Sequence, residues 1–236
     1  MRLEVEISGK TFRSAAGGSH EVLAPVKFAL QSGEVGVLIG PSGCGKSTML
    51  RIILGLDQDF AGHVVRPPEA RIGMVFQEPR LLPWRSVEQN VRLAAPGITD
   101  AKLADLFRIL ELEAHRDHFP GELSLGLARR VALARAFAVE PDLLVLDEPL
   151  ASLDDALAGR LREEIATLVA RRPVMTLLVT HSLDDAIRLG DRLFLLSPRP
   201  ARIVRELSIS TPRAARSEAE IARIRTELAA LRLESK

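Results

Sequence analysis

One stretch of nine residues constrains this chain more than any other. Residues 40–48 read Gly-Pro-Ser-Gly-Cys-Gly-Lys-Ser-Thr, so four residues separate a glycine from Gly-Lys-Ser. The apolar run 35–39 leads in and predicts a buried strand, while residues 49–54 lead out with helical spacing and stop at Gly55. A glycine loop between a strand and a helix start presents backbone N–H groups and a helix dipole to a phosphate. The sequence therefore predicts a P-loop.

Every position of this loop is a predicted nucleotide contact. The glycines let the backbone turn tightly, so that successive N–H groups point into one concavity. Lys46 is expected to reach the outer phosphates, and the Ser47 hydroxyl is expected to ligate Mg²⁺. The predicted contacts are Gly40, Pro41, Ser42, Gly43, Cys44, Gly45, Lys46, Ser47 and Thr48.

The composition of the 236 residues argues against several classes of protein. A net charge of +1 and an aromatic content of 4% do not favour nucleic-acid binding. The single cysteine, Cys44, excludes an internal disulfide, and we expect it to fill space in the loop rather than to act as a nucleophile. The first residues include acids, whereas a signal peptide would be apolar there. A membrane span needs about 18 consecutive apolar residues, and no apolar run approaches that length. We therefore expect a soluble or peripheral protein.

Two acids end a second apolar run. Residues 143–146 are all apolar, which predicts a strand buried on both faces of a parallel sheet, and Asp147 and Glu148 follow. Ligands bind at this end of strands in open α/β sheets, and an acid beside a P-loop can hold Mg²⁺. The alternative, that the two acids cap the next helix, is disfavoured because Pro149 follows directly. We predict Asp147 as a metal ligand.

Two further predicted strands also end in polar residues. Residues 71–76 are followed by Gln77, and residues 176–180 are followed by His181. A histidine there is either a capped loop residue or a phosphate contact, and the neighbouring phosphate and metal residues favour the contact.

The start and the end of the chain are predicted to be β-rich and helical, respectively. Residues 3–7 alternate as a half-buried strand, 9–20 read as a loop, and 22–30 read as a second edge strand. Phe12, in that loop, is either a core plug or a ring stacked on a nucleobase. Residues 193–196 and 202–207 are expected to form a closing hairpin. An amphipathic tail helix is expected to pack on its own domain, with a capping box of Ser217 and Glu220 and apolar Ile221, Ile224, Leu228 and Leu231.

The middle of the chain reads as helical. Residues 86–93 and 100–112 carry helical spacing, with Asp100 as the expected N-cap and a core stripe of Leu103, Leu106, Phe107 and Leu110. A helix is expected from about residue 124 to 139, with Ser124 as N-cap and Arg129 on a solvated face. Apolar Leu81, Leu82 and Trp84 precede these helices on a loop, which either docks a partner or folds onto its own core.

Six elements in this order resemble the ATP-binding cassette (ABC) ATPases, the nucleotide-binding subunits of ABC transporters, from about residue 3 to 207. The resemblance implies an α/β P-loop fold with a mainly parallel sheet flanked by helices, an N-terminal antiparallel β subdomain and a helical subdomain at about 86–138. A helical tail at about 216–236 completes one ATPase domain, 1–236. By resemblance, residues 40–48 are Walker A, Gln77 the Q-loop glutamine, 123–127 the signature, 143–148 Walker B, 152–154 the D-loop and His181 the switch histidine. Phe12 matches the adenine-stacking aromatic.

The resemblance also implies a mechanism, in which two subunits close head to tail around two ATP molecules. Lys46 and the loop amides hold the phosphates, and Ser47 and Gln77 ligate Mg²⁺ with Asp147 close by. The catalytic residues are Glu148, which deprotonates the attacking water, His181, which holds the γ-phosphate, and Gln77. The hydroxyl of Ser124 and the amide of Gly126 reach across to the partner's ATP.

Residues 75–84, Val-Phe-Gln-Glu-Pro-Arg-Leu-Leu-Pro-Trp, look like the nitrate/sulfonate/taurine importer branch. This implies a peripheral subunit on the cytoplasmic side of the inner membrane, working with a permease, a second ATPase subunit and, indirectly, an external substrate-binding protein. No nucleic-acid partner is expected.

The signature departs from the family pattern, since Leu125 replaces a glycine and Leu127 replaces glutamine. A leucine restricts positive φ and its bulk crowds the phosphate, so the site is either active with a shifted backbone or impaired and paired with an intact subunit. Because the catalytic acids, Gln77 and His181 are present, we expect an active enzyme. The alternatives are an ABC ATPase of another system, such as lipid trafficking or export, and a subunit that binds ATP with little hydrolysis.

Overall fold

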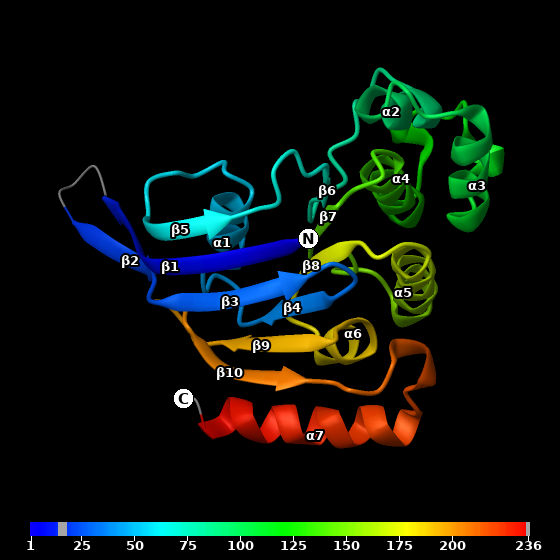
Figure 1. Ribbon diagram of the computed structural model, residues 1–236. Coiled ribbons are helices and arrows are strands. Elements are labelled where there is room, and N and C mark those ends of the chain that lie inside the picture. Colours follow the sequence, from blue (N-terminus) through cyan, green and yellow to red (C-terminus); the bar gives the residue numbers. More distant parts are fainter. Residues whose placement is uncertain (14–17, 235–236) are drawn as a thin grey trace. The chain divides into compact units, whose positions relative to one another are not determined.

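The computed structural model describes residues 1–13 and 18–234, the last four of these as backbone only. The chain divides into two compact units (Figure 1). Unit 1 comprises Met1–Pro68 and Leu177–Lys236, and unit 2 comprises Glu69–Thr176. The predicted loop residues 14–17 and the side chain of Leu231 lie outside the described part.

An antiparallel sheet forms the N-terminal part of unit 1. Its strands are β1 (Arg2–Arg13), β2 (Ser19–Leu23), β3 (Val26–Gln31) and β5 (Ala61–Val65). β1 pairs with the other three strands, and its alternating Leu3, Val5 and Ile7 are buried. The predicted N-terminal antiparallel β-sheet is thus observed.

Two predictions for this region were wrong in detail, and one strand was not predicted. Residues 9–13 continue β1, and Ser19 and His20 belong to β2, so the described parts of the predicted loop are strands. Residues 22–30 form parts of two strands, because Pro25 lacks the N–H that a continuous ladder requires. β5 was not predicted, since its residues are half-exposed to exposed and give no apolar run.

The remaining strands of unit 1 surround β4, which carries the P-loop at its end. β4 (Val35–Ile39) is completely buried and runs parallel to β9 (Arg192–Leu196). β9 and β10 (Ile203–Ser208) form the predicted closing hairpin. β8 (Met175–Thr180), which belongs to unit 1 from Leu177 onward, follows β4 on its other side. The apolar run of β4 is explained by this burial between neighbours.

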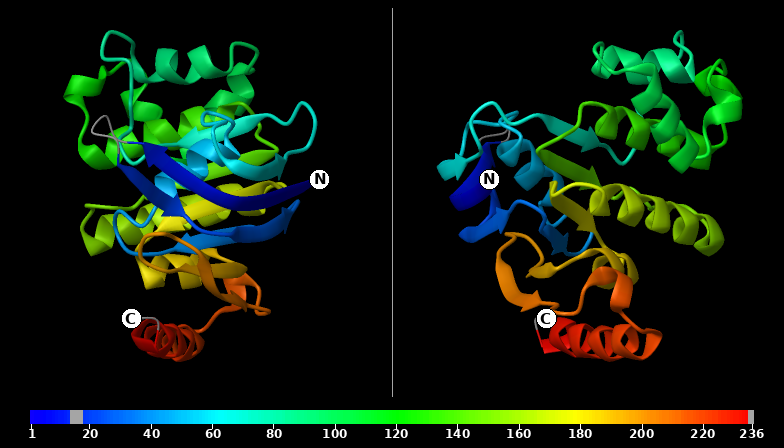
Figure 2. Two further views of the ribbon diagram at one scale, coloured as in Figure 1. Left: turned by 90° about the vertical axis from the view of Figure 1, so that its left-hand side faces the viewer. Right: turned by 45° about the vertical axis from the view of Figure 1, so that its right-hand side comes forward.

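Three α-helices belong to unit 1: α1 (Lys46–Ile53), α6 (Leu183–Leu189) and α7 (Glu218–Glu234). α7 packs against α6 and buries Ile221, Ile224 and Leu228, as predicted (Figure 2). The capping box is only partly formed: the Glu220 amide donates to Ser217 Oγ (3.2 Å), whereas the Glu220 carboxylate accepts from Thr211 Oγ1 (2.6 Å). A 3₁₀ turn, Arg213–Ala215, precedes α7.

Unit 2 combines a parallel strand pair with helices. β6 (Ile72–Val75) and β7 (Leu143–Asp147) pair in parallel, and the helices are α2 (Val87–Ala94), α3 (Asp100–Ile109), α4 (Leu125–Ala138) and α5 (Asp155–Ala170). Two 3₁₀ turns, Glu113–His115 and Pro120–Glu122, lie between α3 and α4. α4 is central, since it contacts the other three helices and β6. A Cβ on Gly73 would lie 2.4 Å from the Ala136 carbonyl oxygen, so only glycine lets β6 approach α4 this closely.

The predicted core stripe of α3 is observed, because Leu103, Leu106, Phe107 and Leu110 are all buried. Its predicted N-cap was wrong: Thr99 caps the helix by accepting from the Lys102 amide (3.3 Å), and Asp100 is the first helical residue. Within the described residues, no helix is long and apolar enough to cross a membrane.

Candidate nucleotide-binding site

The P-loop joins β4 to α1, and two of its residues adopt backbone conformations that favour glycine. Gly43 has φ of +75° and Gly45 has φ of +129°. A Cβ on Gly45 would also lie 2.9 Å from Leu23 Cδ2 and 3.2 Å from the Val22 carbonyl oxygen. Backbone conformation and packing therefore both require glycine at position 45, directly before the first turn of α1.

The side chain of Lys46 closes this loop. Its Nζ donates to the carbonyl oxygens of Gly40 (2.9 Å) and Pro41 (3.0 Å), and the residue is 5% exposed. Gly45, the N-cap of α1, offers no side-chain hydrogen bond, and the first turn contains no acid. The start of α1 thus keeps its partial positive charge, beside the exposed Ser47 hydroxyl. This arrangement suits an anion such as a phosphate chain.

Two further residues of unit 1 shape the loop, Arg199 beside it and Cys44 within it. Arg199, in the β9–β10 connection, donates from Nε (3.1 Å) and Nη2 (2.6 Å) to the Gly43 carbonyl oxygen, and its Nη1 lies 2.8 Å from His20 Nε2. Arg199 was not predicted as a neighbour of the P-loop, because 156 residues separate it from Gly43 and no local pattern marks it. Cys44 is buried, and burial raises the pKa of its thiol, as expected for a residue that fills space.

Phe12 lies near the end of β1 and is 42% exposed, so the core-plug interpretation was wrong. The Lys10 ammonium lies 4.6 Å from the centre of its ring. Lys10 is held by Asp57 Oδ1 (2.9 Å) and by the carbonyl oxygen of Asp59. The ring is therefore supported by a fixed cation and is open to solvent, while base stacking stays a prediction.

In unit 2 the fold brings Gln77 and the two acids to one edge. β6 and β7 are parallel, and Val75 pairs with Leu146, so Gln77 and Glu148 each follow the same rung by two residues. Asp147 is the last residue of β7, and Glu148 adopts a left-handed φ of +46°. His181 follows β8 directly, in unit 1, and is exposed. The meeting of Lys46 and His181 with these acids on one triphosphate stays a prediction.

The signature segment begins α4 as predicted. Ser124 is the N-cap and accepts from the Leu127 amide (3.3 Å). Gly126 is buried, and a Cβ there would lie 2.8 Å from Leu157 Cδ2, so glycine permits close packing of α4 on α5. The expected conflict between Leu125 and a positive φ was wrong. Leu125 is the first residue of α4, its backbone does not adopt a positive φ, and its side chain is half-exposed.

A Leu125→Gly substitution is expected to keep or raise ATP hydrolysis, since it removes bulk from an exposed position without disturbing a contact of the core. Glycine at the first turn of a helix should lower the free energy of unfolding by no more than about 1 kcal/mol. Steady-state phosphate release at saturating ATP measures the first effect, and thermal denaturation measures the second. A strong loss of hydrolysis in the folded variant would mean that the site requires leucine at position 125 for activity.

The prediction that Arg129 lies on a solvated face was wrong. The residue is 5% exposed, and its guanidinium faces backbone carbonyls of residues 148–151. Arg135, six residues further along α4, donates to the carbonyl oxygens of Pro79 and Arg80 (both 2.8 Å), in the loop after Gln77. In that loop, Trp84 is 69% exposed, which fits a docking surface better than a loop folded on its own core.

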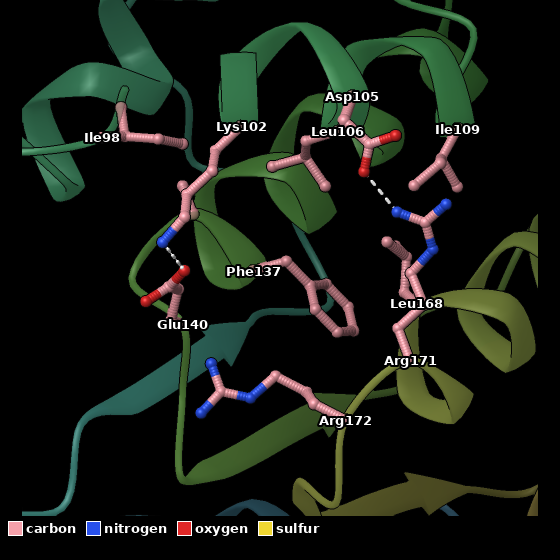
Figure 3. A pocket seen from close by; sticks show the side chains of 11 residues that line it. Ile98, Lys102, Asp105, Leu106, Ile109, Phe137, Glu140, Leu168, Arg171 and Arg172 are labelled. Atoms are coloured by element: carbon pink, nitrogen blue, oxygen red, sulfur yellow. Dashed lines mark hydrogen bonds and ion pairs between the residues drawn. The ribbon is translucent and has the colours of Figure 1, made fainter. Parts of the chain in front are cut away.

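A pocket of about 180 Å³ in unit 2 lies between α3 and the ends of α4 and α5 (Figure 3). Leu106, Ile109, Phe137 and Leu168 supply its apolar lining, and Lys102–Glu140 and Asp105–Arg171 pairs stand at its rim. None of the predicted nucleotide-site residues lines it.

Comparison with known proteins identifies the class to which this fold and P-loop belong. Residues 23–151 match the family described as ABC transporter, and the chain belongs to that family. The protein is therefore an ATP-binding cassette ATPase.

Similar proteins include sulfonate import subunits and a cassette of known structure. The chain is 40% identical over 219 residues to the aliphatic sulfonates import ATP-binding protein SsuB 2 of Burkholderia cenocepacia, covering 89% of this chain and 79% of the relative. It is 39% identical to SsuB 2 of Pseudomonas syringae pv. tomato over 95% of both chains. Among solved structures, the dimeric bacterial cassette MJ0796 aligns with a TM-score of 0.76 and 26% identity, covering 89% of this chain and 100% of that chain. MJ0796 has also been solved in a post-hydrolysis state with ADP and phosphate (TM-score 0.74).

Proposed function

We propose that this chain is the ATP-hydrolysing subunit of a bacterial ABC importer for aliphatic sulfonates. The observation that carries the proposal is the identity of 35–41% to proteins named as sulfonate import ATP-binding subunits, over most of the chain. Residues 75–84 around Gln77 support the same branch of importers. Because the relatives are named as import proteins, a role in lipid trafficking or export is disfavoured.

Within unit 1, Lys46 and the amides of residues 40–48 bind the β- and γ-phosphates of ATP, and Phe12 stacks on the adenine. His181 binds the γ-phosphate. The start of α1, with its uncompensated dipole and no acid in the first turn, supports this assignment.

Within unit 2, Glu148 accepts the proton of the attacking water. Gln77, Asp147 and, from unit 1, the Ser47 hydroxyl are the residues that hold Mg²⁺. When bound, Mg²⁺ neutralises charge on the β- and γ-phosphates. The placement of Gln77 and the two acids beyond one rung of the β6–β7 pair supports their common role.

The working unit is a dimer in which Ser124 and the amide of Gly126 contact the ATP of the second subunit. Phosphate contacts from a helix start are chemically suited to this task, and α4 begins at these residues. The chain acts as one ATPase domain on the cytoplasmic face of the inner membrane, joined to a permease that receives solute from a substrate-binding protein. Trp84 is the most exposed large apolar residue of the loop after Gln77 and is suited to contact the permease.

Two measurements test the proposal. The purified chain should release phosphate from ATP only with Mg²⁺, and the native host lacking the gene should stop growing on an alkanesulfonate as sulfur source while still growing on sulfate. Hydrolysis with unimpaired growth would point to another transport system. Binding of ATP without hydrolysis, with or without the permease, would instead indicate a regulatory module.

A further inference from the structure

Arg129 is a buried cation without an acidic partner. It is 5% exposed, and among the described residues its guanidinium contacts no carboxylate. Its Nε is buried with no hydrogen-bond partner in the part of the chain that the structure describes. Burial lowers the pKa of Arg129, which shows that this environment disfavours the charge. A buried charge held at such a cost is a candidate for function.

The neighbouring Arg130 is buried to a similar extent, and its Nε also lacks a hydrogen-bond partner among the described residues, but Arg130 differs in having acidic partners. Arg130 pairs with the carboxylates of Glu111 and Glu164 (2.6 Å each). It therefore forms an ordinary structural ion-pair cluster between α4, α5 and the turn after α3. The two adjacent arginines of α4 thus perform separate tasks.

Both terminal nitrogens of the Arg129 guanidinium donate hydrogen bonds to one short backbone segment, residues 148–151. Nη1 donates to the carbonyl oxygens of Glu148 (3.2 Å) and Pro149 (2.7 Å), and Nη2 donates to that of Ala151 (2.6 Å). The planar fork of arginine can satisfy several fixed acceptors at once, which the single ammonium of a lysine cannot reproduce.

The backbone of this segment and of the residue after it includes two unfavourable conformations. Glu148 has φ of +46° and Ser152 has φ of +63°, and neither residue is a glycine. Such conformations persist only where the surroundings fix them. The segment closes through one turn, in which the Ala151 amide donates to the Glu148 carbonyl (3.2 Å). The carbonyl of Glu148 is therefore fixed from two sides, by this turn and by Arg129.

We propose that Arg129 is a positioning residue that fixes Glu148 in its catalytic orientation from the signature helix. The inference rests on the proposed role of Glu148 as the base. Arg129 lies five residues after Ser124 and three residues after Gly126, so the helix that Ser124 caps carries both the contacts to the partner's ATP and the arginine that holds the base.

The test compares Arg129→Lys and Arg129→Gln with a matched Arg130→Lys control. Misplacing a catalytic group by about 1 Å costs about 100-fold in rate, so we expect kcat of the Arg129 variants to fall about 10- to 100-fold. Their Kd for ATP, measured by equilibrium binding, should stay within a few-fold of wild type. Arg130→Lys should lower the melting temperature while keeping kcat.

A double-mutant cycle separates positioning from a general structural role. In a Glu148→Gln background, Arg129→Gln should produce no further loss of single-turnover hydrolysis, because the group that it positions is already gone. Additive losses, a wild-type kcat in both Arg129 variants, a proportional loss of ATP binding, or failure of both variants to fold at 25 °C would each overturn the proposal. Absence of hydrolysis in the wild-type chain would instead refute the proposed function.

Discussion

A Glu148→Gln variant is expected to bind ATP as tightly as the wild-type chain and to hydrolyse it about 10²- to 10⁴-fold more slowly. The amide keeps the size and the hydrogen-bonding oxygen of the carboxylate, but it cannot accept the proton of the attacking water, and general-base catalysis contributes that range of rate. Single-turnover phosphate release measures the chemical step, and equilibrium binding measures affinity. Because ATP then persists, gel filtration should detect a trapped closed dimer.

The matched control is Glu163→Gln, which makes the same chemical change at an exposed position of α5. It should leave both hydrolysis and binding unchanged. If Glu148→Gln turned over ATP at the wild-type rate, Glu148 would not be the base. If the variant lost ATP affinity instead, Glu148 would act in nucleotide binding.

Much of the fold could be predicted because the decisive signals are local. The buried strand Val35–Ile39, the glycines and the apolar turn of α1 are consecutive in the sequence, and the structure reproduces that order. Likewise β7 follows directly from an all-apolar run. Such segments are predictable because each carries its own period and its own stop signals.

The failures have a different origin. β5 has exposed residues and is a strand only because β1 offers it a partner, so the sequence contains no signal for it. Arg129 looked solvent-facing because charge usually marks an exposed helix face, and only the chain folding back at residues 148–151 supplies acceptors that bury it. Arg199 reaches Gly43 in the same non-local way. Contacts made by side chains across the fold are thus the part that sequence patterns leave open.

Lys46→Ala should weaken ATP binding about 10- to 100-fold, because hydrogen bonds to charged groups contribute about 1.5 to 3 kcal/mol. Hydrolysis should fall by about 10²- to 10³-fold, as for removal of a donor aimed at developing charge. A second consequence comes from the loop itself. Lys46 Nζ donates to the carbonyl oxygens of Gly40 and Pro41, so alanine also leaves these oxygens without that donor.

Lys46→Arg separates these two effects, since it keeps the charge but places a bulky planar group where a compact ammonium fits. We expect it to retain part of the ATP affinity and little of the hydrolysis. Lys102→Ala is the control, because Lys102 is exposed and pairs with Glu140 on the surface, where such pairs contribute less than about 1 kcal/mol. Equal ATP affinity in Lys46→Ala, Lys102→Ala and wild type would contradict phosphate binding by Lys46. In that case the lysine would serve only to hold the loop, and a lower melting temperature of Lys46→Ala without a change in Kd would reveal it.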